Sequence, residues 1–295
     1  MSSEQKKFSI VVASYNQAEF IERTLMSIIN QGVETEIIVI DGGSTDGTVE
    51  YLKKLDETIC KGEKSFAPTK CVNFKYISEP DNGQSHALNK GFAMATGDIF
   101  GWQNSDDVYM PGAFKKVLEA FEKHSEKRVV YGNWYEIDEF DNVIDKTYSA
   151  PKPRIPHFSY EGFDANLQAM FWKREVHDKF GKFDESFHQL MDSDFLFSVI
   201  LNQGVDIFTK IDEFLGSFRR HQLQKTKRER IDKRAVNEQK LVDEKYGFAS
   251  SKSIKGFVIR VNYLFAKIVW QVRQGGIVYM LKKNLRAFFK RAGHF

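Results

Sequence analysis

Two adjacent acids in the segment GWQNSDDVYMP, residues 101–111, are the side chains best suited to chemistry. Asp106 and Asp107 directly follow the apolar run GDIFGW, which is typical of a buried strand. Carboxylates in such a position carry a desolvation cost unless a cation pairs with them. Mg²⁺ and Mn²⁺ prefer hard oxygen ligands and often combine one or two carboxylates with phosphate oxygens. The pair therefore indicates a divalent-metal site that holds a phosphorylated ligand.

Two further polar clusters also follow short apolar runs. The run FSIVVAS ends in Ser14 and is followed by Tyr15 and Asn16. The run EIIVI is followed by a turn that contains Asp41 and Gly43. Ligands of open α/β sheets bind outside the carboxyl ends of the strands. Each cluster alone is typical of a capped turn, but three of them on one sheet edge favour a single binding site.

The glycine-rich motifs of the common nucleotide folds are missing from the sequence. No G-x-G-x-x-G follows the first apolar run, and no G-x-x-x-x-G-K-[ST] occurs. A dinucleotide site and a P-loop are therefore disfavoured. Without a glycine-rich cradle, a bound diphosphate needs a metal and basic side chains.

The elements that position these clusters follow from the hydrophobic pattern. Buried parallel strands are predicted at residues 8–14, 36–41, 74–78 and 98–103. Helices are predicted from Ile21 to Gln31, from Thr48, over 85–97, after Pro111 and over 192–204. Residues 56–73 are expected to form a loop, 128–134 a further strand, and 135–190 a wrap around the open sheet edge. The alternation of strands and helices predicts an α/β fold with a mostly parallel sheet and right-handed crossovers.

The net charge of +3 conceals an asymmetric distribution of charge. From Arg219 to the C-terminus there are 20 Lys and Arg but only 5 Asp and Glu. Within that region, 256–274 and 277–291 have the pattern of basic amphipathic helices, which favours contact with an anionic membrane through residues 252–295. The alternative is that these helices pack on the protein or on a second subunit. Nucleic acid is not expected as a partner, because no recognition fold is evident.

The sequence shows no recognisable signal peptide or membrane span, and its two cysteines suit a reducing compartment. We therefore expect a cytoplasmic protein that is peripheral at the cytosolic face of a membrane. The first apolar run is too short for a signal peptide, and no segment reaches the ~18 uninterrupted apolar residues of a membrane span. Cys60 and Cys71 have no zinc-binding spacing and are expected to be free thiols in a reducing compartment.

Several segments, in the right order, resemble family 2 glycosyltransferases of the GT-A fold. The nucleotide-binding half of that family is similar to SIVVASYNQAEFIERTLMSIINQ, EIIVIDGGSTDGT and ISEPDNGQSHALNKGFAMATGDIFGWQNSDD. Its acceptor half resembles LQAMFWKREVHDKFGKFDESFHQLMDSDFLFSV, and its closing segment resembles GSFRRHQLQKT. The resemblance covers roughly residues 8–226. It implies a GT-A domain over 1–226, with a nucleotide-sugar half at 8–110 and an acceptor half at 111–226, before a helical basic region at 227–295.

The resemblance implies an inverting transfer from a nucleotide-sugar, with a divalent metal, Mn²⁺ or Mg²⁺, as cofactor. Asp41 matches the acid that binds the base, which suits uracil and suggests a UDP-sugar. Asp106 matches the metal ligand of the D-x-D motif, and His221 resembles the C-terminal histidine that completes the metal site. The alternative for His221 is a solvated or phosphate-contacting residue. The donor-binding residues are expected to be Ser14, Tyr15, Asn16, Asp41, Gly43, Asp81, Gln84, Asn89, Lys90, Asn104, Ser105, Asp107 and Lys225.

The resemblance also implies a general base. Asp192, in the segment MDSD, matches the residue that takes the proton of the acceptor hydroxyl. Asp194 is the rival base or an acceptor-side residue, and the alternative is a structural role if Asp192 opens a helix and Asp194 points elsewhere. Gln168 and Trp172 are candidates for acceptor binding, although core packing is the alternative for the tryptophan. No enzyme nucleophile is needed, because a single displacement inverts the anomeric centre.

Two positions depart from the family pattern. Asn104 stands where the first Asp of D-x-D is usual, and Leu88 stands where many relatives carry Arg. We expect Lys90 or Lys225 to supply the missing positive charge. The predicted function is sugar transfer to a glycan or a lipid-linked glycan. The rivals are a sugar-phosphate nucleotidyltransferase and a degenerate sugar-nucleotide-binding or scaffold protein.

Overall fold

The computed structural model describes residues 6–60, 72–153, 165–222, 224, 233–248, 261, 265 and 268–281. The chain comprises two compact units. The first contains residues 1–155 and 163–238, and the second contains 156–162 and 239–295.

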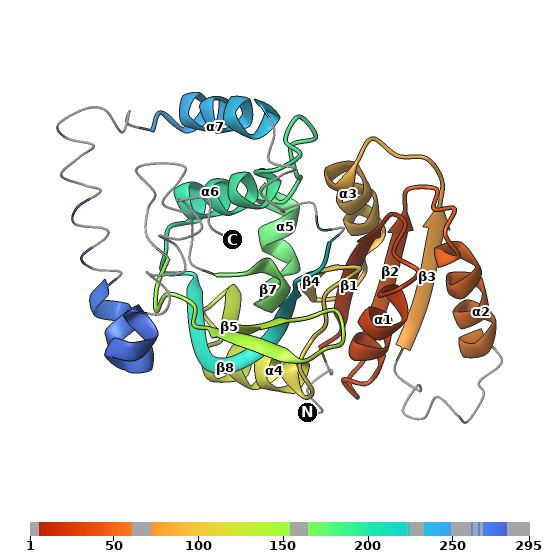
Figure 1. Cartoon of the computed structure of the whole chain (residues 1–295), viewed down its shortest axis with the longest axis horizontal. Helices are drawn as coiled ribbons and strands as arrows, with labels where there is room; N and C mark the ends of the chain where they lie inside the picture. Colours follow the sequence, from red (N-terminus) through yellow and green to blue (C-terminus); the bar gives the residue numbers. More distant parts are fainter. Residues whose placement is uncertain are drawn as a thin grey trace. The chain divides into compact units, whose positions relative to one another are not determined.

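The first unit is built on one eight-stranded sheet with the order β3-β2-β1-β4-β7-β5-β6, in which β8 also pairs with β5 (Figure 1). The strands are β1 Phe8–Ser14, β2 Thr35–Asp41, β3 Val72–Ser78, β4 Ile99–Asn104, β5 Val129–Ile137, β6 Val143–Thr147, β7 Met170–Lys173 and β8 Phe208–Arg219. The first four are parallel to one another, and β8 is parallel to β5. The predicted mostly parallel sheet flanked by helices is confirmed.

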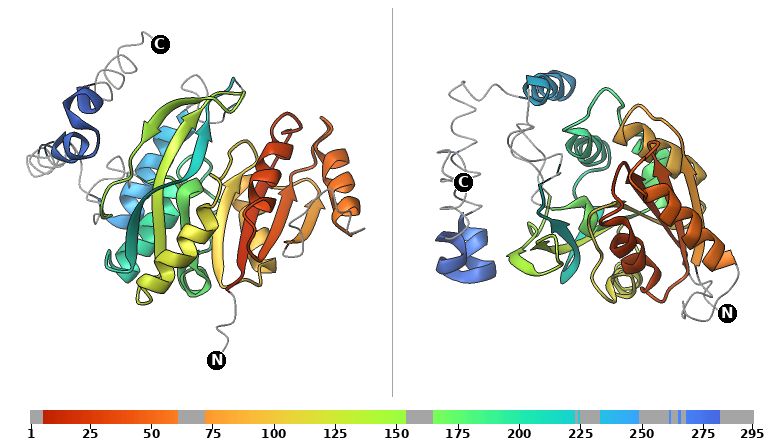
Figure 2. Two further views of the ribbon diagram at one scale, coloured as in Figure 1. Left: turned by 90° about the horizontal axis from the view of Figure 1, so that it is seen from below. Right: turned by 45° about the vertical axis from the view of Figure 1, so that its right-hand side comes forward.

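Helices cover both faces of this sheet, because β1 and β2 are buried along their whole length. The helices of the first unit are α1 Ile21–Ile29, α2 Thr48–Cys60, α3 Gln84–Met94, α4 Ala113–Lys123, α5 Arg174–Phe180 and α6 Met191–Gln203, and a 3-10 turn lies at Leu167–Ala169. A further helix, α7 Lys233–Tyr246, contains residues of both units. One core cluster joins the apolar faces of α1, α2 and α4 to alternate residues of β1 and β2. On the other face, α3 packs against β1 and β2, and Phe92 of α3 contacts Phe100 of β4 and Trp172 of β7. The helices around the sheet can be followed in Figure 2.

Two expectations for the middle of the chain were wrong. The segment 135–190 does not simply wrap the open edge, because β7 inserts between β4 and β5 and is antiparallel to both. Residues 56–60 are helical rather than a loop, since α2 continues to Cys60. The strand β7 has only four residues, MFWK, which is too short for a periodic pattern to reveal.

In the second unit, residues 268–281 are helical. Ile277 and Val278 of this helix are exposed by 62% and 78%, and Leu281 is exposed by 49%. Over the described part of the chain, no helix combines the length and the apolarity that crossing a bilayer requires. The basic residues expected at 282–291 lie outside the described residues, as does Cys71.

Candidate active site

An open pocket of about 750 Å³ lies in the first unit at the carboxyl ends of β1, β2 and β4. Its volume lies in the range of small-molecule binding sites. Seven of the residues predicted from the sequence line it: Ser14, Tyr15, Asp81, Gln84, Asn104, Ser105 and Asp106. The parallel sheet brings these segments together, because strands with a common direction end at a common edge.

The predicted metal ligands lie side by side. His221 Nε2 is 2.9 Å from Asp106 Oδ2, although the two residues are 115 positions apart in the chain. The imidazole is held in place by Phe20, whose ring centre lies 4.5 Å away. Phe20 is itself 2% exposed, so the contact is part of the packed interior.

This pair fits a divalent cation by its donor chemistry. Two ligand atoms about 2.1 Å from one metal and at right angles to each other stand about 3 Å apart, which matches the carboxylate–imidazole separation. The His221 Nδ1 atom is buried and has no hydrogen-bond partner among the described residues. Within the same residues, no three His, Cys, Asp or Glu side chains gather into a ligand set. The protein would therefore hold the metal through two side chains and leave its other positions to phosphate and water, as Mg²⁺ sites commonly do.

Asp107 plays a different part from its neighbour. It is 1% exposed, and burial, reinforced by the charge of Asp106, raises the pKa of its carboxyl well above the usual value. The backbone N–H of Arg219 donates to its Oδ1 at 2.7 Å, and Asn104 Nδ2 donates to its Oδ2 at 3.0 Å. Asp107 therefore lies beneath the pocket wall rather than in it.

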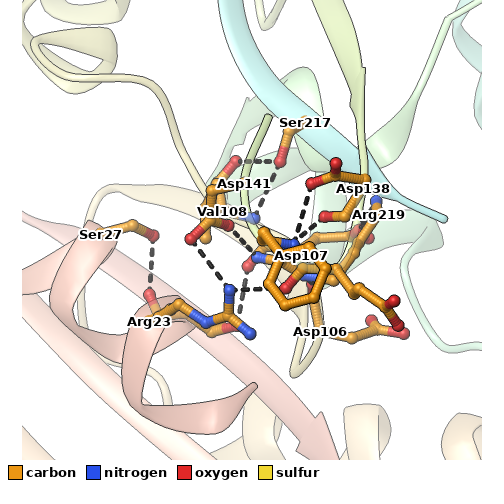
Figure 3. Close-up of polar contacts among 12 residues, drawn as sticks. Arg23, Ser27, Asp106, Asp107, Val108, Asp138, Asp141, Ser217 and Arg219 are labelled. Atoms are coloured by element: carbon orange, nitrogen blue, oxygen red, sulfur yellow. Dashed lines mark hydrogen bonds and ion pairs between the residues drawn. The ribbon is translucent and has the colours of Figure 1, made fainter. Parts of the chain in front are cut away.

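Arg219 ties the acidic turn to the end of β8 (Figure 3). Its guanidinium is fully buried, donates to the backbone carbonyl of Asp106 at 2.6 Å and to that of Asp138 at 2.9 Å, and pairs with Asp141. It also lies over the ring of Phe20, 5.1 Å from the centre. A cation of the protein itself therefore accompanies the two acids at the end of β4, and it fixes the backbone on which Asp106 stands.

Helix α1 secures the same turn from another side. The Thr24 hydroxyl is buried and lies 2.9 Å from the carbonyl oxygen of Ser105 and 2.8 Å from that of Asp107, so it can donate to either. The acidic turn is thus held by a helix and by a strand that are distant in sequence, and such support preorganises a ligand site.

Asn104 is engaged within the protein on both sides of its amide. Its Oδ1 accepts from Gln84 Nε2 at 2.9 Å while its Nδ2 donates to Asp107. A carboxylate at this position would instead face the buried Asp107 acid at hydrogen-bond distance. The Asn104 amide therefore supplies an acceptor for Gln84 and a donor for Asp107, whereas an ionised carboxylate would supply acceptors only.

The mouth of the pocket beside β2 is shaped by a glycine. A Cβ on Gly42 would stand 3.1 Å from Asp81 Oδ2 and 3.3 Å from the ring of Tyr15, so its absence lets these two side chains approach each other. Tyr15 is 62% exposed and presents an aromatic face to a ligand. Asp81 Oδ1 accepts from the N–H of Gly83 at 2.7 Å, which fixes the carboxylate at the wall.

Asp41 and Asn16 support this wall from within. The buried Asp41 carboxylate accepts from the N–H groups of Gly43 and Ser44 at 3.1 and 2.9 Å and from the Ser78 hydroxyl at 2.8 Å. Asn16, at a φ of 52°, accepts from the N–H of Thr45. Both side chains organise the turns after β1 and β2, and neither lines the pocket.

The two candidate bases differ in exposure. Asp192 is exposed in the first turn of α6, where its Oδ1 accepts the N–H of Ser193 at 2.7 Å. Asp194 is 3% exposed and belongs to the packed side of the same helix. Of the two, only Asp192 is exposed to solvent, and neither lines the pocket.

The other predicted residues that the structure describes do not line the pocket. Asn89 Nδ2 donates to the carbonyl of Phe183 at 2.8 Å, and Lys90 is paired with Glu79. Gln168 is 6% exposed, and Trp172 is 1% exposed and packs against aromatic residues of α3 and α6. Lys225 lies outside the described residues.

Some lining residues were not predicted from the sequence. They include Gln17, Gly42, Pro80, His188, Gln189, Phe218 and Gln224. Proximity to Asp192 and to His221 in the chain could have indicated His188, Gln189 and Phe218. Nothing in the local sequence distinguishes Arg219 from Arg220, because only the strand geometry turns the first of them inward.

Comparison with known proteins agrees with this fold. Residues 9–181, more than half of the chain, match the model of Glycosyl transferase family 2. An uncharacterized glycosyltransferase of Nostoc sp. is 30% identical over 163 residues, which cover 55% of this chain and 46% of that protein. Chondroitin synthase of Escherichia coli is 30% identical over 144 residues, covering 48% and 19%. The chain thus spans less than half the length of these two relatives.

Solved structures share the fold at low identity. The crystal structure of S. aureus TarS has a TM-score of 0.56 and 16% identity and covers 72% of this chain and 37% of that one. TarS 1–349 in complex with UDP-GlcNAc has a TM-score of 0.53 and 17% identity, covering 74% and 60%. With the family match over residues 9–181, the chain belongs to glycosyltransferase family 2 and has a GT-A fold.

Proposed function

We propose that this protein is an inverting glycosyltransferase that moves a sugar from a UDP-sugar to a hydroxyl of a glycan or lipid-linked glycan. The observation that carries the proposal is the pocket at the strand ends, which Tyr15, Asp81 and Asp106 line and where Asp106 lies 2.9 Å from His221. The Tyr15 ring and the Asp81 carboxylate suit a base, and the Asp106–His221 pair suits a metal that accompanies a diphosphate. Solved complexes of TarS with UDP and UDP-GlcNAc support the choice of nucleotide.

Each residue has a physical task in this reaction. Tyr15 stacks on the base, and Asp81, which lines the pocket where the buried Asp41 does not, accepts a hydrogen bond from the uracil imide in place of Asp41. Asp106 and His221 would hold a divalent metal, which supplies positive charge for the diphosphate. Asp192 takes the proton of the acceptor hydroxyl as its oxygen attacks the anomeric carbon, and the diphosphate leaves from the opposite face.

A thermal-shift screen with Mn²⁺ and UDP-, GDP- and dTDP-sugars tests this proposal. A ligand at 100 times its Kd stabilises the folded state by about 2.7 kcal/mol, so we expect a UDP-sugar with Mn²⁺ to raise the Tm by about 5 °C. Asp106→Asn should lose the Mn²⁺-dependent part of this shift. Asp212→Asn, which changes a carboxylate that is 81% exposed, should keep it.

Two results of the same screen would replace the proposal with a rival. Stabilisation by a nucleoside triphosphate and a sugar 1-phosphate, with none by a UDP-sugar, would favour a nucleotidyltransferase. Binding of the UDP-sugar without UDP release, in the presence of every acceptor tried, would favour a degenerate binding protein.

We further propose that the second unit brings the enzyme to the cytosolic face of an anionic membrane, where a lipid-linked acceptor lies. The exposed apolar residues Ile277, Val278 and Leu281, with the basic residues that follow in the sequence, support this location. Sedimentation with vesicles rich in phosphatidylserine should pellet the full chain, and neutral phosphatidylcholine vesicles should not, because about 1 kcal/mol per basic residue comes from anionic lipid. A chain without residues 252–295 that still pellets equally would contradict the membrane contact.

A further inference from the structure

A buried carboxylate beyond the family-matched region holds the turn that leads into α6. Glu238 is 2% exposed and belongs to the first unit. Its Oε1 accepts the N–H of His188 at 3.0 Å, and its Oε2 accepts the N–H groups of Gln189 and Leu190 at 2.7 and 3.0 Å. Three consecutive backbone donors thus converge on one side chain from a segment 48 to 50 positions away.

The three donors stand just before α6, where Leu190 is the residue before the helix and His188 and Gln189 precede it. N–H groups at the start of a helix have no partner inside it, and the residue before α6, Leu190, has no capping side chain. A carboxylate is the acceptor best suited to this end of a helix, because the helix dipole adds to its hydrogen bonds. Glu238 therefore binds the N–H of the residue before α6 and those of the two residues ahead of it, and it does so from a distant part of the chain.

The turn held by Glu238 is part of the candidate active site. His188 and Gln189 line the pocket, and Asp192 follows in the first turn of α6. On its other side the same segment is tied to α3, where the Ser85 hydroxyl donates to the carbonyl of Phe187 at 2.9 Å. The backbone leading to Asp192 is therefore held by two separate side chains, because Ser85 of α3 binds residue 187 and Glu238 binds residues 188–190.

We propose that Glu238 is a positioning residue for sugar transfer. By fixing the His188–Leu190 turn, it sets where the Asp192 carboxylate stands relative to the bound donor. The inference rests on the proposed function for the role of Asp192. It assigns to the region after residue 226 a part in the active site, in addition to any contact with a membrane.

Glu238→Gln tests the role with little change in shape, because the amide keeps one acceptor oxygen but turns an NH₂ group toward backbone donors. Glu244→Gln is the matched control, since it makes the same charge change at an exposed position of α7. UDP release is followed with Mn²⁺ and the UDP-sugar that gives the largest thermal shift. We expect Glu238→Gln to lower kcat about 10–100-fold, because small misplacements of catalytic groups have effects of this size, and Glu244→Gln to leave it unchanged.

A double-mutant cycle separates positioning from a general structural role. If Glu238 acts through Asp192, adding Glu238→Gln to Asp192→Asn should produce no further fall in kcat, whereas independent effects multiply. An equal fall in both backgrounds, or a kcat equal to that of Glu244→Gln, would overturn the proposal. A wild-type chain that releases no UDP would instead contradict the proposed function.

Amide hydrogen exchange gives a readout that does not depend on turnover. The N–H groups of residues 188–190 should be protected in the wild-type chain and should exchange faster in Glu238→Gln and in Glu238→Asp, whose shorter side chain cannot reach all three donors. Glu238→Asp keeps the negative charge, and it serves as the test variant if Glu238→Gln fails to fold. Unchanged exchange in both would show that Glu238 does not hold this turn.

Discussion

Replacement of Asp192 by Asn should lower kcat about 10²–10⁴-fold while UDP binding with Mn²⁺ is retained. This magnitude is the usual contribution of a general base. Asp192 is exposed at the start of α6 and is not part of the packed core, so its amide should leave the Tm close to that of the wild-type chain. The measurement is UDP release at saturating donor, together with UDP titration by calorimetry.

Two controls make the result specific. Asp206→Asn changes an exposed acid just beyond α6 and should leave kcat unchanged. Asp194→Asn alters the rival base, which is 3% exposed, and should reduce stability more than it reduces turnover per folded molecule. If Asp194→Asn abolished turnover and Asp192→Asn did not, the two roles would have to be exchanged.

Replacement of Arg219 by Met should lower the free energy of unfolding by about 3–5 kcal/mol. The change removes charged hydrogen bonds to two backbone carbonyls, each contributing about 1.5–3 kcal/mol. The lost pair with Asp141 adds little, because that carboxylate is 41% exposed and can be hydrated. Urea denaturation followed by circular dichroism measures the difference.

Arg220→Met is the matched control for this variant. The neighbouring arginine is 36% exposed and pairs with Glu136, so its loss should change stability by less than about 1 kcal/mol. Because Arg219 also holds the backbone of Asp106, Arg219→Lys should weaken the Mn²⁺-dependent thermal shift even where the chain remains folded. Equal stabilities of the Arg219→Met and Arg220→Met chains would contradict the role assigned to the buried guanidinium.

Much of the nucleotide half of the fold follows from local sequence. The runs FSIVVAS and EIIVID and the periodicity after Ile21 are strong because buried parallel strands are apolar on both faces and amphipathic helices repeat with their turns. The polar clusters at the ends of these runs predicted the pocket edge, since parallel strands end together. The observed β1, β2 and α1 agree with those expectations.

Weaker local signals explain the errors in the middle of the chain. The strand β7 has four residues, which are too few to show a hydrophobic periodicity, and its antiparallel pairing with both neighbours has no signature in the local sequence. The hydrogen-bond partners of the site residues could not be predicted from the local sequence either. Nothing near Asn104 in the sequence indicates that Gln84 and Asp107 would occupy both sides of its amide.

The sequence by itself determined which residue types stand at the strand ends, and therefore that a site for a metal and a diphosphate was to be expected there. Only the tertiary structure decided which of the adjacent acids faces the pocket. Asp106 lies beside His221, whereas Asp107 is buried against the Arg219 backbone. Only folding could bring Glu238 to the turn before Asp192 as well. The physical reason is that a motif specifies donors and acceptors along the chain, while burial and pairing depend on segments that meet only in three dimensions.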